Sequence, residues 1–188
     1  MKKITTISGG TGGFMLLTGL KKYDADISAI VSMSDDGGST GELRDELGVL
    51  PPGDVRQCLV ALSDASEELR ALMTYRFSEG GLKGHSFGNL FISALEKTQN
   101  NFLDAIETAG DILKVKGRVV PVTGDDARLR MELKDGTLLE GEDVIDHGNF
   151  QKQGVKKLSF NSKVRANPKA VESILSADVV VIGPGSRG

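Results

Sequence analysis

Residues 3–17 read KITTISGGTGGFMLL, and this stretch sets the expectation for the whole fold. Lys3–Ser8 is short and rich in β-branched residues, so it predicts a strand. The glycine-rich segment 9–13 predicts a tight turn, and the apolar residues from Phe14 to Leu17 predict a helix directly after it. A strand followed by a glycine turn and a helix opens a βαβ unit, which implies a parallel sheet with right-handed crossovers.

A second strand, a polar loop and a helical region follow. Residues 27–32 (ISAIVS) predict the second strand of the unit, and residues 33–41 (MSDDGGSTG) predict a loop at its end. Residues 54–114 then carry four helical patterns in succession, which a simple alternation of strands and helices does not contain. The sequence therefore predicts a helical insertion here, with Asp54 capping its first helix and Ser86 its third.

The last third of the chain returns to β patterns. Residues 117–123 and 155–160 each predict a strand. The Asp-Gly pair at 135–136 lies between the alternating segment 129–133 and a return strand that begins at 138. This pair is a strong hairpin indicator, because a tight type I′ turn needs residues that accept positive φ.

The final segment predicts a helix and one more strand of the parallel sheet. Asn167-Pro168 opens the helix, with proline at its first position. Three of its apolar residues are expected to face the core: Val171, Ile174 and Leu175. Residues 178–182 (DVVVI) are nearly all apolar, as expected of a strand covered on both faces. A helix normally follows such a strand, so we expect the domain to be truncated at its C-terminus. We predict one α/β domain over residues 1–188, with a Rossmann-like parallel sheet, a helical insertion at about 54–114 and a β-hairpin.

Composition excludes several classes of protein. The 188 residues are 39% hydrophobic and 26% charged, with a formal net charge of −3. These values exclude a disordered chain, and the mixed charges exclude a broad nucleic-acid footprint. The single cysteine, Cys58, excludes an intramolecular disulfide and a cysteine-built metal site, and it suits a cytoplasmic protein. No apolar run reaches the roughly 18–20 residues of a membrane span, so we expect no membrane insertion.

Glycine is concentrated near the N-terminus, where ten of the 24 glycines fall within the first 53 residues. Gly10, Thr11, Gly12 and Gly13 lie between the first strand and its helix. Glycine lets a ligand approach the backbone closely, and a helix N-terminus favours phosphate. The segment is not the dinucleotide fingerprint, because Met15 stands where the third glycine belongs, and no Gly-Lys-Ser/Thr of a Walker loop follows. A structural turn is the alternative, but four glycines in five residues favour an anion site.

Polar residues after the second strand are expected at the same edge of the sheet, where the carboxyl ends of parallel strands meet. Asp35 or Asp36 suits hydrogen bonds from ribose or sugar hydroxyls, or contact with a cation. Ser39, Thr40 and Arg44 suit contacts to phosphate. A solvated turn is an equal alternative for this loop, because Asp-Gly-Gly and Ser-Thr-Gly are common turn formers.

Further candidates lie in the helical insertion and after the last strand. Arg56 stands in the first turn of a helix and opposes the helix dipole, which an anionic ligand would explain. A solvated surface arginine is the alternative. The polar turn before the third helix offers three residues that could close the site: His85, Ser86 and Asn89. Contacts to phosphate or sugar are also expected of three residues after the last strand: Gly183, Gly185 and Ser186. His147 is expected in a solvent loop.

Six motifs follow one another along the chain: GGTGG (9–13), SDDGGSTGELR (34–44), PPGDVRQCLVAL (51–62), GHSFGNLF (84–91), GRVVPVTGDD (117–126) and VVIGPGS (180–186). Together they resemble the CofD-like superfamily, and they are most similar to its YvcK branch, the bacterial gluconeogenesis factors. The resemblance covers essentially the whole chain. It implies a Rossmann-like sheet with an added helical part, in proteins that continue well beyond the GPGS segment.

The resemblance implies two functions. The YvcK branch is associated with growth on gluconeogenic carbon sources, with cell shape and with wall synthesis, and it is similar to proteins that bind UDP-sugars without an established reaction. The CofD branch transfers 2-phospho-L-lactate to a deazaflavin with a divalent metal. We favour the first, because the CofD branch reads Thr-Gly-Asp-Asp where this chain has Met33–Asp36. The shared acidic pair, Asp35 and Asp36, keeps metal-assisted transfer open, with Mg²⁺ as its cofactor.

We therefore expect one nucleotide-sugar site in a cytoplasmic regulatory protein, with a UDP-sugar or another nucleotide as its ligand. The glycine segment would cradle phosphate, and Asp35 or Asp36 would contact hydroxyls. Five residues would add polar or cationic contacts or cap the adjoining helix: Ser39, Thr40, Arg44, Asp54 and Arg56. An NAD(P)-binding oxidoreductase is a third alternative, disfavoured by the missing third glycine. Whether the chain forms a homo-oligomer is left open.

Overall fold

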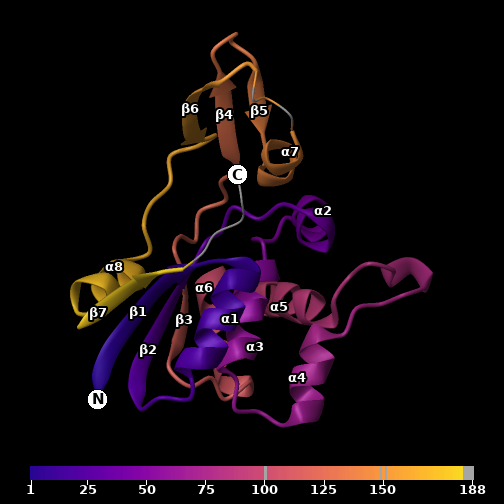
Figure 1. Cartoon of the computed structure of the whole chain (residues 1–188). Coiled ribbons are helices and arrows are strands. Elements are labelled where there is room, and N and C mark those ends of the chain that lie inside the picture. The colour runs from indigo at the N-terminus through magenta and orange to yellow at the C-terminus, as the bar shows by residue number, and fades with distance from the viewer. Residues whose placement is uncertain (100, 149, 151, 184–188) are drawn as a thin grey trace.

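A parallel sheet forms the centre of the protein (Figure 1). The computed structural model describes residues 1–99, 101–148, 150 and 152–183. The sheet has the strand order β3-β2-β1-β7, and every neighbouring pair is parallel. Its strands are β1 (Lys2–Ser8), β2 (Ala25–Val31), β3 (Arg118–Pro121) and β7 (Val179–Ile182). The parallel sheet predicted from the first 17 residues is confirmed.

Apolar helices cover one face of this sheet. They are α1 (Gly10–Leu20), α3 (Gly53–Leu62) and α6 (Phe102–Ile112), and α1 packs directly on α3. The main core lies between them and the strands, and its fully buried members include Leu17, Ile27, Val55, Leu59 and Ile106. Successive strand residues point to opposite faces, so Ile30 lies on the other side. There it packs with Val120 and with Ala170 of α8 (Pro168–Leu175).

The helical insertion is present as α3, α4 (Glu67–Thr74), the 3₁₀ turn η1 (Gly80–Leu82), α5 (Phe87–Thr98) and α6. Ser86 caps α5 as predicted, because its Oγ accepts a hydrogen bond from the Asn89 N–H at 3.1 Å. The prediction that Asp54 caps α3 is wrong. Pro52 occupies the N-cap, no side chain caps this helix, and Asp54 lies inside its first turn.

Two short helices were missed by the sequence patterns. Residues predicted as loop up to position 41 begin α2 (Gly38–Leu47). Glycines give this segment the composition of a turn, yet Gly41 is needed for packing, since a Cβ there would lie 2.0 Å from the Asp36 carbonyl oxygen. The second missed helix is α7 (Glu142–His147), so the assignment of His147 to a loop is also wrong.

A separate antiparallel sheet stands above the carboxyl ends of the parallel strands (Figure 1). It comprises β4 (Leu129–Leu133), β5 (Leu138–Glu140) and β6 (Val155–Phe160) in the order β5-β4-β6. The predicted hairpin is β4–β5, and β6 pairs with the free side of β4. Helix α7 lies between β5 and β6 in the chain and packs against β4 and β5. This small sheet therefore carries α7 to the carboxyl edge of the large one.

The last helix and strand are more exposed than the sequence predicts. In α8 the buried residues are Ala170 and Ser173, whereas three apolar residues expected in the core are exposed: Val171, Ile174 and Leu175. Strand β7 was expected to be covered on both faces, but Ile182 is 81% exposed. Within the described residues β7 pairs only with β1, so it forms an edge of the sheet. No described helix has the length and apolarity of a membrane span.

The crossing of the chain into β3 depends on Gly117. Its φ is +92°, and a Cβ there would lie 2.2 Å from the Ile27 carbonyl oxygen of β2. We expect Gly117→Ala to lower the free energy of unfolding by about 2–4 kcal/mol, because it combines positive-φ strain with a backbone clash. Urea denaturation followed by circular dichroism measures this change.

Gly19→Ala is the matched control, because a Cβ at Gly19 in α1 meets nothing within 4 Å. There alanine should leave stability unchanged or raise it by about 0.5–1 kcal/mol. Equal effects of the two substitutions would contradict the role assigned to Gly117.

Candidate functional site

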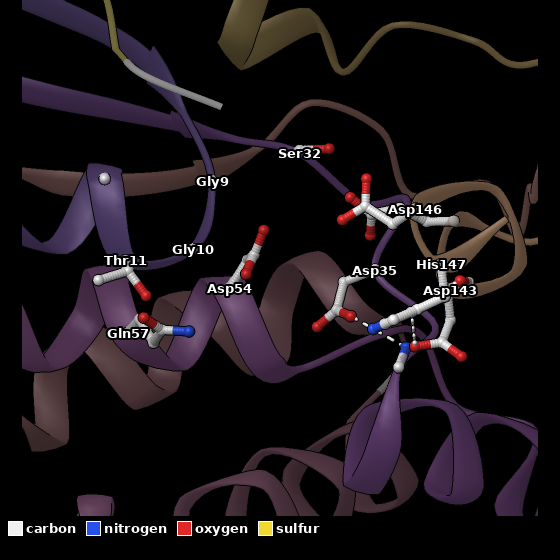
Figure 2. Close-up of a pocket in the computed structure, with 13 residues that line it drawn as sticks. Gly9, Gly10, Thr11, Ser32, Asp35, Asp54, Gln57, Asp143, Asp146 and His147 are labelled. Carbon is white, nitrogen blue, oxygen red and sulfur yellow. Dashed lines mark hydrogen bonds and ion pairs between the residues drawn. The ribbon is translucent and has the colours of Figure 1, made fainter. Parts of the chain in front are cut away.

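A cavity of about 550 Å³ lies where β1 and β2 end. Its walls come from the glycine segment, from the segment after β2, from α3 and from α7 (Figure 2). The lining residues are Gly9, Gly10, Thr11, Gly12, Ser32, Asp35, Gly37, Asp54, Gln57, Glu142, Asp143, Asp146 and His147. Of the residues predicted for the site, Gly10, Thr11, Gly12, Asp35 and Asp54 thus lie together around one volume.

The glycine segment approaches Asp54 closely. Gly9 is the N-cap of α1, and a Cβ on it would lie 2.4 Å from Asp54 Oδ2. Gly10 has a φ of +53°, and its backbone hydrogen-bonds to the Asp54 carboxyl group and lowers its pKa. The partial positive charge of the α1 N-terminus therefore faces Asp54 across the mouth of the glycine turn. Figure 2 shows Asp54 between this turn and the α7 residues.

The Asp54 carboxyl group is strongly perturbed. Burial, the largest cause, acts together with the negative charges of Asp35 and Glu142 to raise its pKa from 3.8 to about 7. The hydrogen bond from Gly10 and the charge of Arg56 oppose this shift but do not cancel it. A carboxyl group that exchanges its proton near neutral pH, in a cavity, is typical of a functional site.

The two neighbouring aspartates have different roles. Asp35 lines the cavity, and its Oδ1 accepts a hydrogen bond from the Gly37 N–H at 3.0 Å. Asp36 is not among the lining residues, and its Oδ1 accepts a hydrogen bond from the Asp143 N–H at 2.9 Å. That donor lies in the first turn of α7, so Asp36 holds the N-terminus of α7 in place. Of these two aspartates, only Asp35 lines the cavity and is positioned to contact a ligand there.

Helix α7 supplies four lining residues that sequence reasoning missed: Glu142, Asp143, Asp146 and His147. The Asp143 carboxylate lies 3.3 Å from His147 Nδ1. The sequence does contain a helix pattern here, with acidic residues in the first turn, histidine in the last and Gly148 directly after it. The pattern spans only six residues, which is too short to stand out from a turn.

Several predicted site residues instead form a buried polar cluster. Ser39 Oγ lies 3.0 Å from His85 Nδ1 and accepts a weaker bond, at 3.4 Å, from Asn89 Nδ2. Arg56 Nε donates to Asn89 Oδ1 at 2.9 Å, and His85 Nε2 lies 3.2 Å from Glu42 Oε2. None of these residues lines the cavity. The cluster joins α2, α3 and the N-terminus of α5, so it holds α3, which carries the lining residues Asp54 and Gln57, against its neighbours.

The other predicted site residues also lie outside the lining. Arg44 is buried, and it donates from Nε to Asp126 Oδ1 at 3.0 Å and from Nη2 to the Ala127 carbonyl at 2.8 Å. It thus anchors the segment that leads to the antiparallel sheet. Thr40 is buried next to Gly53, and Gly183 packs on Ser8. Gly13 and Ser86 lie outside the lining, and Gly185 and Ser186 lie outside the described residues.

Comparison with known families gives a match along almost the whole chain. The family described as 2-phospho-L-lactate transferase CofD matches residues 4–187. The chain belongs to the CofD family. It is 46% identical over 187 residues to a protein of Thermotoga maritima named "Putative gluconeogenesis factor" and 40% identical over 186 residues to the "Gluconeogenesis factor" of Listeria monocytogenes. Each match covers 98% of this chain, with 58% and 57% of the respective relative.

A relative of known structure has the same fold. The crystal structure of protein BH3568 from Bacillus halodurans superposes with a TM-score of 0.91 at 41% identity, covering 98% of this chain and 59% of that one. The resemblance to gluconeogenesis factors inferred from the six motifs is confirmed. Across the curated relatives the chain spans about 40–60% of their length.

The acidic residues of the cavity raise the question of a metal. Within the described parts of the chain, no three His, Cys, Asp or Glu side chains are grouped as a complete metal cluster would be. Asp35 and Asp54 nevertheless line one volume and interact electrostatically. Their oxygen atoms are the ligand type that Mg²⁺ prefers, and Mg²⁺ is often held by only two carboxylates and substrate phosphates.

The pKa of Asp54 links stability to pH. The folded protein keeps the Asp54 proton up to about pH 7, whereas the unfolded chain releases it near 3.8, so folding takes up a proton in that window. The free energy of unfolding should therefore fall as pH rises from 3.8 to about 7. Asp54→Asn keeps an acceptor oxygen for Gly10 but cannot ionise. We expect this substitution to raise the free energy of unfolding at pH 8 by roughly 1–3 kcal/mol. The free energy of unfolding should then fall less steeply as the pH rises.

Urea titrations at several pH values between 4 and 8 measure this effect. Asp24→Asn is the control for loss of one charge, because Asp24 is exposed on the surface. If the free energy of unfolding of Asp54→Asn depends on pH in the same way as that of the unmodified chain, the ionised Asp54 carboxylate is not destabilised by its surroundings.

Proposed function

We propose that this chain is the nucleotide-sugar-binding part of a regulatory protein that responds to UDP-sugars and adjusts carbon flow into cell-wall precursors and cell shape. The observation that carries the proposal is the cavity itself. One wall is a glycine segment at a helix N-terminus, and the opposite walls present carboxylate oxygens. A nucleotide sugar carries the two matching chemistries, a diphosphate and a polyhydroxyl ring.

The two halves of such a ligand fit different walls. Backbone N–H groups at the start of α1, next to Gly10 and Gly12, suit phosphate oxygens. Asp35 is an acceptor that suits ribose or sugar hydroxyls. Asp54 takes up a proton below pH of about 7, which lets a phosphate approach it without full charge repulsion. The volume of about 550 Å³ lies within the ordinary range of small-molecule sites.

The regulatory role is supported by the names of the relatives. Two relatives in Listeria species carry the name "Gluconeogenesis factor" rather than the name of a reaction. UDP-sugars are both products of sugar synthesis and building blocks of the wall. A protein that binds them is therefore placed to link growth on gluconeogenic carbon to wall synthesis.

A second candidate is metal-assisted transfer of a 2-phospho-L-lactate group. It is favoured by the family description and by the electrostatic contact between Asp35 and Asp54. A divalent cation between two carboxylates would relieve their repulsion and would neutralise phosphate charge on the substrate. The two candidates differ in whether the ligand needs a metal.

Saturating UDP-glucose or UDP-N-acetylglucosamine should raise the melting temperature by about 5–10 °C, by mass action at about 100 times Kd. NAD should leave it unchanged. Differential scanning calorimetry measures the shift. Gly12→Val should abolish the shift, because Gly12 lines the cavity and a valine there would crowd the space that the phosphates need.

Gly19→Val is the matched control, since it lies in the same helix and points into open space. It should keep the ligand-induced shift. A shift with NAD and none with UDP-sugars would reject the nucleotide-sugar proposal, and a Gly12→Val variant that still responds would remove the glycine segment from the site.

Binding of the UDP-sugar should survive EDTA, because the regulatory proposal needs carboxylates only as hydrogen-bond acceptors. Asp35→Asn should weaken binding by roughly 1–3 kcal/mol, the range for losing a hydrogen bond to a charged group. Isothermal titration calorimetry on one preparation measures both effects. Loss of binding in EDTA that Mg²⁺ restores would place the transferase first.

A further inference from the structure

The cavity has an unusual distribution of charge. Five carboxyl groups line it: Asp35, Asp54, Glu142, Asp143 and Asp146. No lysine or arginine is among the lining residues that the structure describes, and His147 is the one titratable nitrogen base among them. Positive potential for a diphosphate therefore comes from the backbone at the start of α1, together with the charge of the buried Arg56, which reaches Asp54 from outside the lining.

The acidic residues are concentrated on the side away from the glycine segment. Three of them belong to α7, and Figure 2 shows Asp143, Asp146 and His147 across the cavity from Gly9 and Gly10. Asp143 and Asp146 are exposed to the solvent, so their charges reach into the cavity rather than into the core. The part of a ligand that is distant from its phosphates meets these two carboxylates.

The α7 side is also held in position. Asp36 accepts a hydrogen bond from the Asp143 N–H, and a Cβ at Gly37 would lie 3.3 Å from Asp143 Oδ1. The acidic face of α7 is thus fixed against the segment that follows β2. A ligand cannot displace it without losing the contact with Asp36.

Building on the proposed nucleotide-sugar function, we propose that α7 determines which sugars the site accepts: it selects neutral or amine-bearing sugars and rejects sugars that carry a carboxylate. Hydroxyl and ammonium groups donate hydrogen bonds to Asp143 and Asp146. A sugar carboxylate in the same place has no donor to offer and meets two like charges. These carboxylates line the same cavity as the glycine segment, so a ligand whose phosphates bind that segment has its sugar within reach of them.

Three ligands with the same uridine diphosphate separate this effect: UDP-glucose, UDP-glucuronate and UDP-glucosamine. Calorimetric titration at pH 7 and constant salt should give UDP-glucuronate a Kd at least tenfold higher than that of UDP-glucose. UDP-glucosamine should bind at least as tightly as UDP-glucose. Asp146→Asn should reduce the ratio of the UDP-glucuronate and UDP-glucose Kd values to below threefold, because it removes a charge and keeps an acceptor.

Asp111→Asn is the matched control. Asp111 is an exposed aspartate at the end of α6, outside the cavity lining, and the variant should keep the original ratio of Kd values.

Titration with UDP alone measures binding of the nucleoside diphosphate without the sugar. If UDP and UDP-glucose bind but UDP-glucuronate binds equally well, the selectivity of α7 is rejected while the nucleotide-sugar function stands. If Asp111→Asn narrows the ratio as much as Asp146→Asn, the effect is one of net charge and the role of α7 is rejected. Absence of binding by every ligand rejects both proposals.

Discussion

The approach of Asp54 to the glycine segment is the contact on which the arrangement of the cavity depends. α1 and α3 pack closely enough that the Asp54 carboxylate lies where a side chain on Gly9 would be. A buried carboxyl group is costly, and here the cost is reduced by the Gly10 backbone and by a raised pKa. The same packing that buries core residues such as Leu59 therefore also places a titratable group at the end of β1.

The remaining walls of the cavity are positioned by polar contacts rather than by the apolar core. The cluster of Ser39, His85, Asn89 and Arg56 joins α2, α3 and α5. Asp36 then connects the segment after β2 to α7. Buried polar networks of this kind require nearly every partner to be present, because an unpaired buried group is expensive. They specify geometry where hydrophobic contacts alone would permit several arrangements.

The sequence predicted the parallel sheet, the helical insertion and the hairpin, because each has a repeating pattern over many residues. It also placed the glycine segment and Asp35 at one edge of the sheet. It could not separate residues that touch the cavity from residues that support it, since Arg44 and His85 have the composition of ligand-binding residues but are used internally. Nor did it find α7, a helix of six residues, four of which line the cavity because the small sheet carries them to the ends of β1 and β2.

Because of the connection between the two sheets, the walls of the cavity are constrained to different degrees. The chain leaves the parallel sheet after β3, forms the antiparallel sheet and α7, and returns at α8. Helix α7 is therefore part of an insertion between elements that build the core. Substitutions of the α7 residues that line the cavity alter one of its walls without changing any residue of the parallel sheet. The wall formed by the glycine segment, by contrast, is part of the turn between β1 and α1 and is constrained by the packing of Gly9 on Asp54. One wall of the cavity is therefore tied to the packing of the parallel sheet and its helices, whereas the opposite wall is carried by a separate sheet.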